Sequence, residues 1–194
     1  ERHVAVRRQR QMCIRDSYSP GEPSGIGPDL IIKLSSSNLW EDLKIPIVSI
    51  GDPKLFIDRA AVLKKKIQIV ELESLNEVSK NTRGLLQIIK VTKCSNTRPG
   101  KLYKSNAQYV LNNLTYSIEQ TMQNEETALV TGPLSKENII SIDKLFIGHT
   151  EYIKKITQSK DVLMMLASDQ LRVALATTHI PVSYTHLTLP TNSN

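Results

Sequence analysis

The sequence predicts an α/β fold with a mixed, mostly parallel sheet and flanking helices. Short apolar runs typical of strands alternate with segments in which apolar residues have helical spacing. Turns containing Gly or Pro separate many of these segments. Alternation of strands and helices favours a parallel sheet, and such sheets bind ligands beyond the carboxyl ends of their strands.

The first elements follow a loop rich in glycine and proline at residues 20–28. Residues 29–34 are expected to form the beginning of a helix, and the apolar run 45–50 predicts a buried strand. Asp52 is then the expected N-cap of a second helix, with Pro53 in its first position. The helical spacing of four apolar residues supports this helix: Leu55, Phe56, Ala60 and Leu63.

Two strands, at 67–70 and 86–91, precede a turn at 99–100. Ser105 and Gln108 have the spacing of a capping box, which marks the start of the clearest helix. Its apolar residues share one face: Ala107, Val110, Leu111, Leu114, Ile118 and Met122.

The last elements begin with a strand at 127–131, which ends in a Gly-Pro turn, and a short helix at 136–142. Two further strands are expected at 162–167 and 171–176. The short link at 168–170 suits a hairpin, which would make the sheet mixed.

Composition excludes several classes of protein. No apolar run approaches the length of a membrane-spanning helix, and no apolar region of a signal peptide follows the basic start. The two cysteines, Cys13 and Cys94, predict no disulfide framework, which fits a cytoplasmic location. The formal charge is +6, but residues 1–17 contribute +3 through five arginines, Glu1 and Asp16, so the rest carries only +3. That distribution argues against a nucleic-acid protein.

Both ends of the chain read as foreign sequence. Residues 1–17 have neither a helical nor a strand period, and residues 183–194 are polar and rich in threonine. Both resemble translated sequencing-adapter read-through, so we place the native segment at 18–182. Genuine disordered tails are the alternative. Of the four histidines, only His149 and His179 lie in the native segment.

Two motifs rich in glycine or proline could carry chemistry. The segment GEPSGIGP at 21–28 leads into a helix N-terminus, where free N–H groups attract anions. It matches neither the dinucleotide-binding fingerprint nor the P-loop, so a tight structural turn and a loop facing a ligand both remain open. In TGPLSK at 131–136, Ser135 is a plausible N-cap, and Lys136 is either solvated or within reach of an anion.

Two histidines follow in similar settings. In GHTE at 148–151, Thr150 can cap the next helix, or His149, Thr150 and the helix N–H groups can converge on a phosphate. In TTHIP at 177–181, His179 follows a strand and could bind a metal, although one histidine alone does not make a metal site.

Read in order, four segments resemble the N-terminal half of the 4-hydroxythreonine-4-phosphate dehydrogenase family: GEPSGIGPD, TGPLSKE, FIGHTEYI and VLMMLASDQLRVALATTHIP. The resemblance covers residues 20–181. It implies a fold like that of isocitrate and isopropylmalate dehydrogenases, here truncated, and a cytoplasmic homodimer. It also implies NAD-dependent oxidation of the C3 hydroxyl of 4-phosphooxy-L-threonine in pyridoxal phosphate biosynthesis. The 3-oxo acid decarboxylates to 3-amino-2-oxopropyl phosphate, and a divalent metal (zinc, magnesium or cobalt) assists as a Lewis acid.

The resemblance assigns few residues. His149 and Thr150 match the family's substrate-binding pair, and His179 matches the first of three metal-binding histidines. The other metal ligands and further substrate contacts lie in the family's second half, so no catalytic base and no NAD contact is assigned. We therefore expect the 194-residue chain alone to be inactive.

Two alternatives remain open at this point. A relative within the same class would oxidise another phosphorylated hydroxy acid, such as threonate or erythronate 4-phosphate. A non-catalytic phosphate-binding fragment that ends near residue 182 would use its histidines as helix caps.

Overall fold

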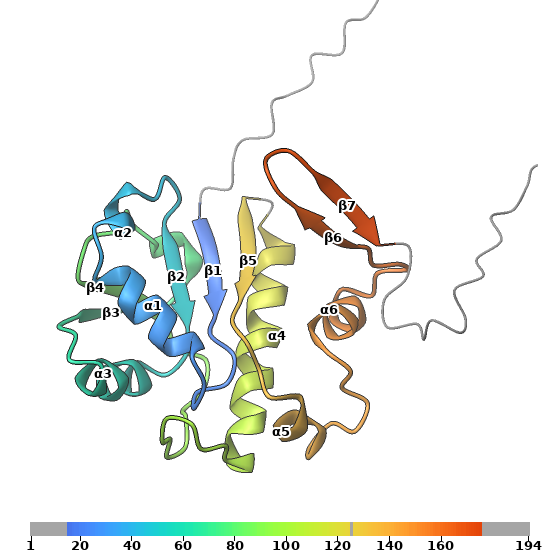
Figure 1. Cartoon of the computed structure of the whole chain (residues 1–194), viewed down its shortest axis with the longest axis horizontal. Coiled ribbons are helices and arrows are strands. Elements are labelled where there is room, and N and C mark those ends of the chain that lie inside the picture. Colours follow the sequence, from blue (N-terminus) through green and yellow to red (C-terminus); the bar gives the residue numbers. More distant parts are fainter. Residues whose placement is uncertain (1–14, 125, 176–194) are drawn as a thin grey trace, which may run out of the picture.

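The computed structural model describes residues 15–124 and 126–175 and contains a five-stranded parallel sheet in the order β3-β4-β2-β1-β5 (Figure 1). The five strands are β1 (Arg15–Ser19), β2 (Ile47–Ile50), β3 (Gln68–Leu72), β4 (Leu85–Ile89) and β5 (Thr127–Thr131). The helices are α1 (Gly27–Ser35), α2 (Leu39–Asp42), α3 (Pro53–Val62), α4 (Ala107–Gln123), α5 (Lys136–Ile140) and α6 (His149–Thr157). Two short 3-10 helices are η1 (Leu75–Glu77) and η2 (Lys104–Asn106).

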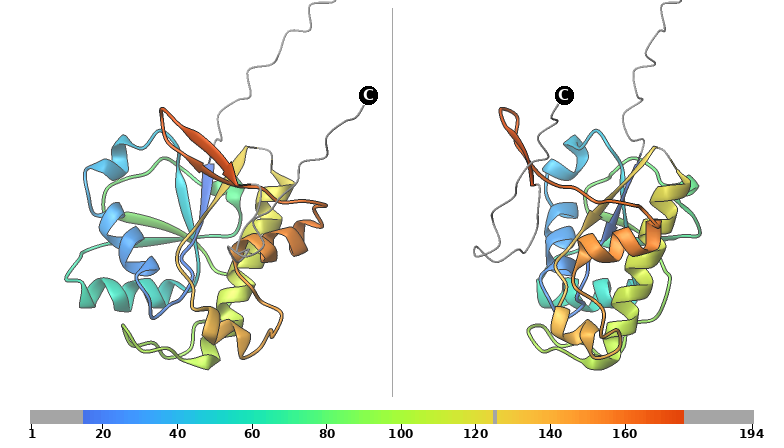
Figure 2. Two further views of the ribbon diagram at one scale, coloured as in Figure 1. Left: turned by 45° about the vertical axis from the view of Figure 1, so that its right-hand side comes forward. Right: turned by 90° about the vertical axis from the view of Figure 1, so that its right-hand side faces the viewer.

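Helices cover both faces of the sheet, so the predicted α/β class is confirmed. One core cluster joins α1, α2 and α3 to the sheet and includes Ile32, Trp40 and Phe56, none of them exposed to solvent. On the other side of β1 and β5 lies α4, and α6 packs in turn on α4 (Figure 2). The hydroxyl groups of Thr115 and Tyr152, 2.7 Å apart, join these two helices.

The last two strands do not join the main sheet in the described part of the chain. β6 (Met164–Ala167) and β7 (Arg172–Leu175) form an antiparallel hairpin, as expected, but it stands apart as a two-stranded sheet (Figures 1 and 2). Its apolar side chains are exposed, including Met165 and Leu166. The expected mixed sheet is therefore a parallel sheet plus a separate antiparallel pair.

Two of the predicted N-caps are confirmed. The Asp52 carboxylate accepts a hydrogen bond of 3.2 Å from the Lys54 amide at the start of α3, and Pro53 is the first residue of that helix. The Ser135 hydroxyl accepts from the Asn138 amide at 3.2 Å and so caps α5. Both helices therefore begin where the sequence predicts.

Two other predicted caps are wrong. Ser105 lies inside η2, and α4 begins after Asn106 with no side-chain cap. The side-chain amide of Gln108 donates to the side-chain oxygen of Asn112 within the helix, so it does not take part in a capping box. The helix α6 begins at His149, one residue before Thr150, so Thr150 is in its first turn and cannot be its cap. No helix of the described residues is long and apolar enough to cross a membrane.

The strand β1 was not expected from the sequence, and it begins before residue 18, the expected start of the native segment. Arg15, Asp16 and Ser17 pair with β5, and Asp16 and Ser17 also pair with β2. The folded unit thus includes three residues of the segment 1–17, and the foreign origin of both ends stays a prediction.

Candidate substrate-binding site

The loops that follow β1 and β5 meet at the carboxyl edge of the sheet. The Gly132 amide donates to the Ser19 carbonyl at 2.7 Å, and the Glu22 amide donates to the Pro133 carbonyl at 3.0 Å. The motifs GEPSGIGP and TGPLSK are therefore neighbours, as the parallel sheet predicts. Together they form the carboxyl edge of the sheet at β1 and β5.

Glycines allow these two loops to approach each other. Gly21 has a φ of +76°, and a Cβ placed on it would lie 2.2 Å from the Pro133 carbonyl oxygen. A Cβ on Gly27 would lie 1.8 Å from the Pro20 carbonyl oxygen, and one on Gly132 would lie 2.4 Å from the same oxygen. Backbone packing thus explains these glycines, which favours the structural-turn interpretation of the motif.

A buried arginine fixes the conformation of the first loop. From α3, the Arg59 guanidinium donates to the carbonyls of Pro23 (2.6 Å) and Gly25 (3.1 Å) and to the carboxylate of Asp29 (2.7 Å). Its side chain is only 3% exposed. The loop is therefore held by a charged group that lies more than 30 residues further along the chain.

A second buried contact joins the first loop to α5. The Glu22 carboxylate accepts from the Ser24 amide at 3.2 Å and from the Asn138 side-chain amide at 3.1 Å. Asn138 also donates to the Tyr103 carbonyl at 3.1 Å. Glu22 and Asn138 are each 4% exposed. This contact sets the position of α5, whose first residue is Lys136.

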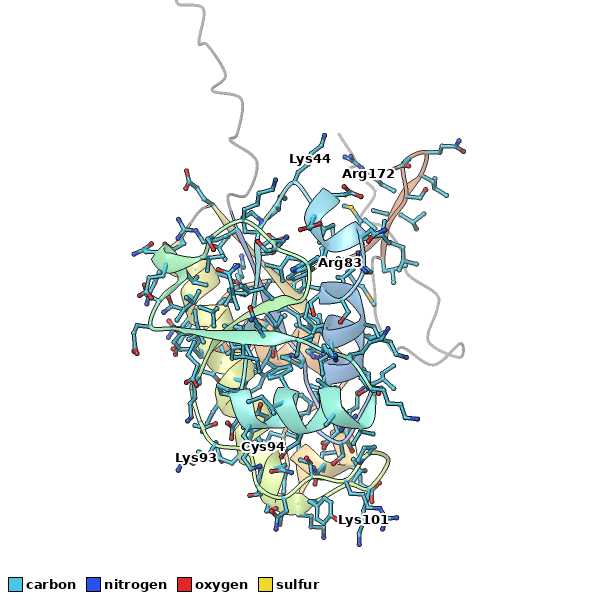
Figure 3. The ribbon with its side chains drawn as sticks, turned by 90° about the vertical axis from the view of Figure 1, so that its left-hand side faces the viewer. Lys44, Arg83, Lys93, Cys94, Lys101 and Arg172 are labelled. Atoms are coloured by element: carbon cyan, nitrogen blue, oxygen red, sulfur yellow. The ribbon has the colours of Figure 1, made fainter. Side chains whose placement is uncertain are left out.

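The segments that follow β2 and β4 contain Asp52 and Cys94, and the Cys94 thiol is not an activated nucleophile. The Asp52 carboxylate accepts from the Cys94 amide at 2.9 Å, and the Tyr109 hydroxyl accepts from the Asp52 amide at 3.0 Å. Cys94 packs between α3 and α4 (Figure 3). Burial, reinforced by the charges of Asp52 and Glu22, raises the pKa of the Cys94 thiol to about 12. The thiol is thus protonated at neutral pH.

The structure brings Lys136 to the start of α6. A Cβ atom placed on Gly148, the residue before His149, would lie 3.6 Å from Lys136 Nζ and 3.3 Å from a Glu151 carboxylate oxygen. His149 and Thr150 are half-buried in the first turn of α6. The pair assigned from the family resemblance therefore lies beside a cationic side chain from another element.

The electrostatics of this site favour the neutral form of His149. Burial lowers the pKa of His149 below its usual value, and the positive charge of Lys136 lowers it further. A neutral imidazole both donates and accepts one hydrogen bond, so it can contact an anionic or a hydroxyl group of a ligand.

The lowered pKa of His149 makes stability depend on pH. Below about pH 6.5 the unfolded state binds a proton more readily than the folded state, so the free energy of unfolding falls as the pH decreases. We expect His149→Gln to reduce this loss. Urea denaturation of both proteins at about pH 7.5 and about pH 5.5 measures it. Equal losses in both proteins would show that His149 is not the group responsible.

The expected metal ligand His179 lies outside the described residues. Among residues 15–124 and 126–175, no group of three His, Cys, Asp or Glu side chains could hold a metal ion. The described part of the chain thus contains His149 and Thr150, the expected substrate-binding pair, but not the expected metal ligand. Sequence reasoning did not identify the supporting residues Arg59, Glu22 and Asn138, because their partners are distant in sequence.

Comparison with known proteins places this arrangement in a family. The family model described as pyridoxal phosphate biosynthetic protein PdxA matches residues 42–192. The chain belongs to this family. The match extends past residue 182, and the boundary proposed there stays a prediction.

Curated relatives share the same name and are about twice as long as the matched region. The 4-hydroxythreonine-4-phosphate dehydrogenases of Citrobacter koseri and Yersinia pseudotuberculosis are 37% and 39% identical over 164 residues. These alignments cover 84% of this chain but 49% and 48% of the relatives. The chain therefore spans about half the length of the PdxA proteins that it matches.

Solved structures show the same fold. The 4-hydroxythreonine-4-phosphate dehydrogenase from Burkholderia phymatum superposes with a TM-score of 0.78 at 23% identity, covering 88% of this chain and 52% of that one. The enzyme from Klebsiella pneumoniae gives a TM-score of 0.77 at 24% identity, covering 87% and 52%. The expected dehydrogenase-like fold is confirmed over the portion that these structures share.

Proposed function

We propose that this chain is part of an enzyme that oxidises the C3 hydroxyl of 4-phosphooxy-L-threonine with NAD in pyridoxal phosphate biosynthesis. The observation that carries the proposal is the position of His149 and Thr150 at the start of α6, next to Lys136 in the helix that follows β5. The relatives are named 4-hydroxythreonine-4-phosphate dehydrogenases, which supports the substrate. The resulting 3-oxo acid would lose carbon dioxide to give 3-amino-2-oxopropyl phosphate.

The proposed substrate contacts follow from the geometry. The Thr150 hydroxyl and the first amide groups of α6 can donate to a phosphate, and the helix dipole favours negative charge there. Neutral His149 can donate from one ring nitrogen and accept at the other. Binding and orientation of a phosphorylated substrate are thus the tasks of this half of the protein.

The metal and the nucleotide enter the proposal through family membership. A divalent metal (zinc, magnesium or cobalt) bound by His179 and two further histidines would polarise the reacting oxygen. The described residues do not provide the complete ligand set for this metal. NAD contacts are not assigned to residues of this chain.

A cytoplasmic homodimer is also part of the proposal. Exposed apolar side chains on the β6–β7 hairpin support burial of this surface in the complete enzyme, because patches of this kind mark interaction surfaces. The 194-residue chain alone is expected to be inactive, since it spans about half of its relatives.

The test is turnover by the product of the complete reading frame, obtained by sequencing the source locus through and beyond codon 182. We expect NAD reduction with 4-phosphooxy-L-threonine to exceed that with 4-phospho-threonate, and His149→Ala to reduce it. A reversed preference would assign the protein to the related phosphorylated hydroxy acids. Absence of NAD reduction with both substrates would contradict the proposal.

A further inference from the structure

We infer that Lys136 is a further substrate-contacting residue, whose ammonium group binds the substrate phosphate together with Thr150 and the amide groups at the start of α6. The inference rests on the proposed function, because it concerns the same site. The lysine belongs to neither the His-Thr pair nor the metal histidines that the family resemblance assigns. Lys136 and Thr150 lie in different helices, so only the fold brings the two residues to a common phosphate site.

The backbone of Lys136 is held firmly. It is the first residue of α5, and the Ser135 cap fixes the start of that helix. Asn138 attaches α5 to the buried carboxylate of Glu22, and Ile139 is only 1% exposed in the core. The lysine side chain therefore extends from a rigid base toward Gly148, which reduces the entropy lost on binding a ligand.

The groups around the ammonium suit an anion. α6 has no side-chain cap, and its first intrahelical bond runs from the Tyr152 amide to the Gly148 carbonyl. Among the described residues, the amides of His149, Thr150 and Glu151 consequently have no hydrogen-bond acceptor. Lys136 adds a full positive charge where these partial positive charges converge.

The carboxylate of Glu151 is the opposing group. It approaches the same glycine, but the ion pairs found among residues 15–124 and 126–175 include none between Glu151 and Lys136. The ammonium thus remains available to an external anion, and it also offsets the repulsion that Glu151 would exert on a phosphate.

The experiment is a titration of the 194-residue chain with inorganic phosphate at constant ionic strength, followed by NMR signals of the His149 ring. Lys136→Met removes the charge and keeps most of the side-chain length, whereas Lys136→Arg keeps the charge. Lys144→Met is the matched control, because Lys144 is an exposed lysine in the connection between α5 and α6. Amide spectra verify that each variant is folded.

We expect Lys136→Met to weaken phosphate binding about 10- to 100-fold, as loss of one charge-assisted hydrogen bond implies. Lys136→Arg should retain most of the affinity, and Lys144→Met should retain nearly all of it. In the absence of phosphate, Lys136→Met should also raise the pKa of His149, because it removes a neighbouring positive charge. Phosphate binding should raise that pKa in the unmodified chain.

The outcomes separate this inference from the proposed function. If His149→Ala and Thr150→Ala weaken phosphate binding but Lys136→Met does not, the role of Lys136 is wrong and the substrate site stands. If Lys136→Met and Lys144→Met have equal effects, the contribution is general charge and the inference is also wrong. If the unmodified chain binds no phosphate, both the inference and the phosphate site are overturned.

Discussion

Replacing Gly21 with alanine is expected to lower the free energy of unfolding by at least about 3 kcal/mol more than replacing Gly100 with alanine. Both residues have a left-handed backbone, with φ of +76° and +77°. They differ in the space beside them. A Cβ on Gly21 would lie 2.2 Å from the Pro133 carbonyl oxygen, whereas a Cβ on Gly100 would meet nothing within 4 Å.

Gly100→Ala therefore measures the cost of the backbone conformation alone, about 1–2 kcal/mol. Gly21→Ala adds a clash between two backbone segments that cannot rotate away, because the Glu22 amide is bonded to that same carbonyl of Pro133. Urea denaturation of the two variants and the unmodified chain gives the difference. Equal losses would mean that the loops after β1 and β5 do not pack as closely as the structure shows.

The same two loops show what the sequence could predict about the site. The sequence predicts the strand before segment 131–136 but not β1, so the carboxyl-edge rule makes segments 21–28 and 131–136 neighbours only once the structure has shown that each follows a parallel strand. The rule applies to any parallel sheet and requires no knowledge of side chains. It therefore locates the site but does not identify the residues that shape it.

The supporting residues depend on contacts between distant segments. Asn138 reaches Glu22 across 116 positions, and Arg59 reaches Pro23 across 36. Neither residue type signals burial, since arginine, glutamate and asparagine are usually exposed. The only sequence signal was the location of Glu22 inside the motif GEPSGIGP.

The N-caps also show that local interactions can be predicted from the sequence and that those depending on the path of the chain cannot. Asp52 and Ser135 act as caps because their acceptors lie two or three residues from the amides they bind, so the whole interaction is local. The expected capping box at Ser105 failed because the chain enters α4 through the 3-10 turn η2, which takes Ser105 into the turn. Similarly, α6 begins at His149, one residue before Thr150, and its N-cap is Gly148, which has no side chain to cap the helix.

The hairpin illustrates a further limit. Two apolar runs separated by a short polar link predict that β6 and β7 pair, and they do. Pairing of neighbours is local, but membership of a larger sheet depends on where the preceding segment leads the chain. Here α6 and the residues after it place the pair apart from β5, with its apolar side chains exposed (Figure 1).

Replacing Arg59 with methionine is the second change with a large expected effect, about 3–5 kcal/mol of lost stability. Methionine keeps the apolar stem and removes the guanidinium. The carbonyls of Pro23 and Gly25 would lose their donors inside the protein, and the Asp29 carboxylate would lose its counter-ion. Leaving buried acceptors and a charge without partners costs more than the contacts themselves contribute.

Lys54→Met is the matched control, because it removes a positive charge from the same helix α3. The Lys54–Asp58 pair is an exposed pair with an i, i+4 spacing, so its loss should change stability little. Asp29→Asn keeps an oxygen acceptor for Arg59 and should give a loss between the two. Chemical denaturation measures the three variants, and hydrogen exchange of the Ser24 and Gly25 amides reports on the loop. If Arg59→Met were no more harmful than Lys54→Met, the loop would be held by its glycines and by Glu22, without a contribution from the buried arginine.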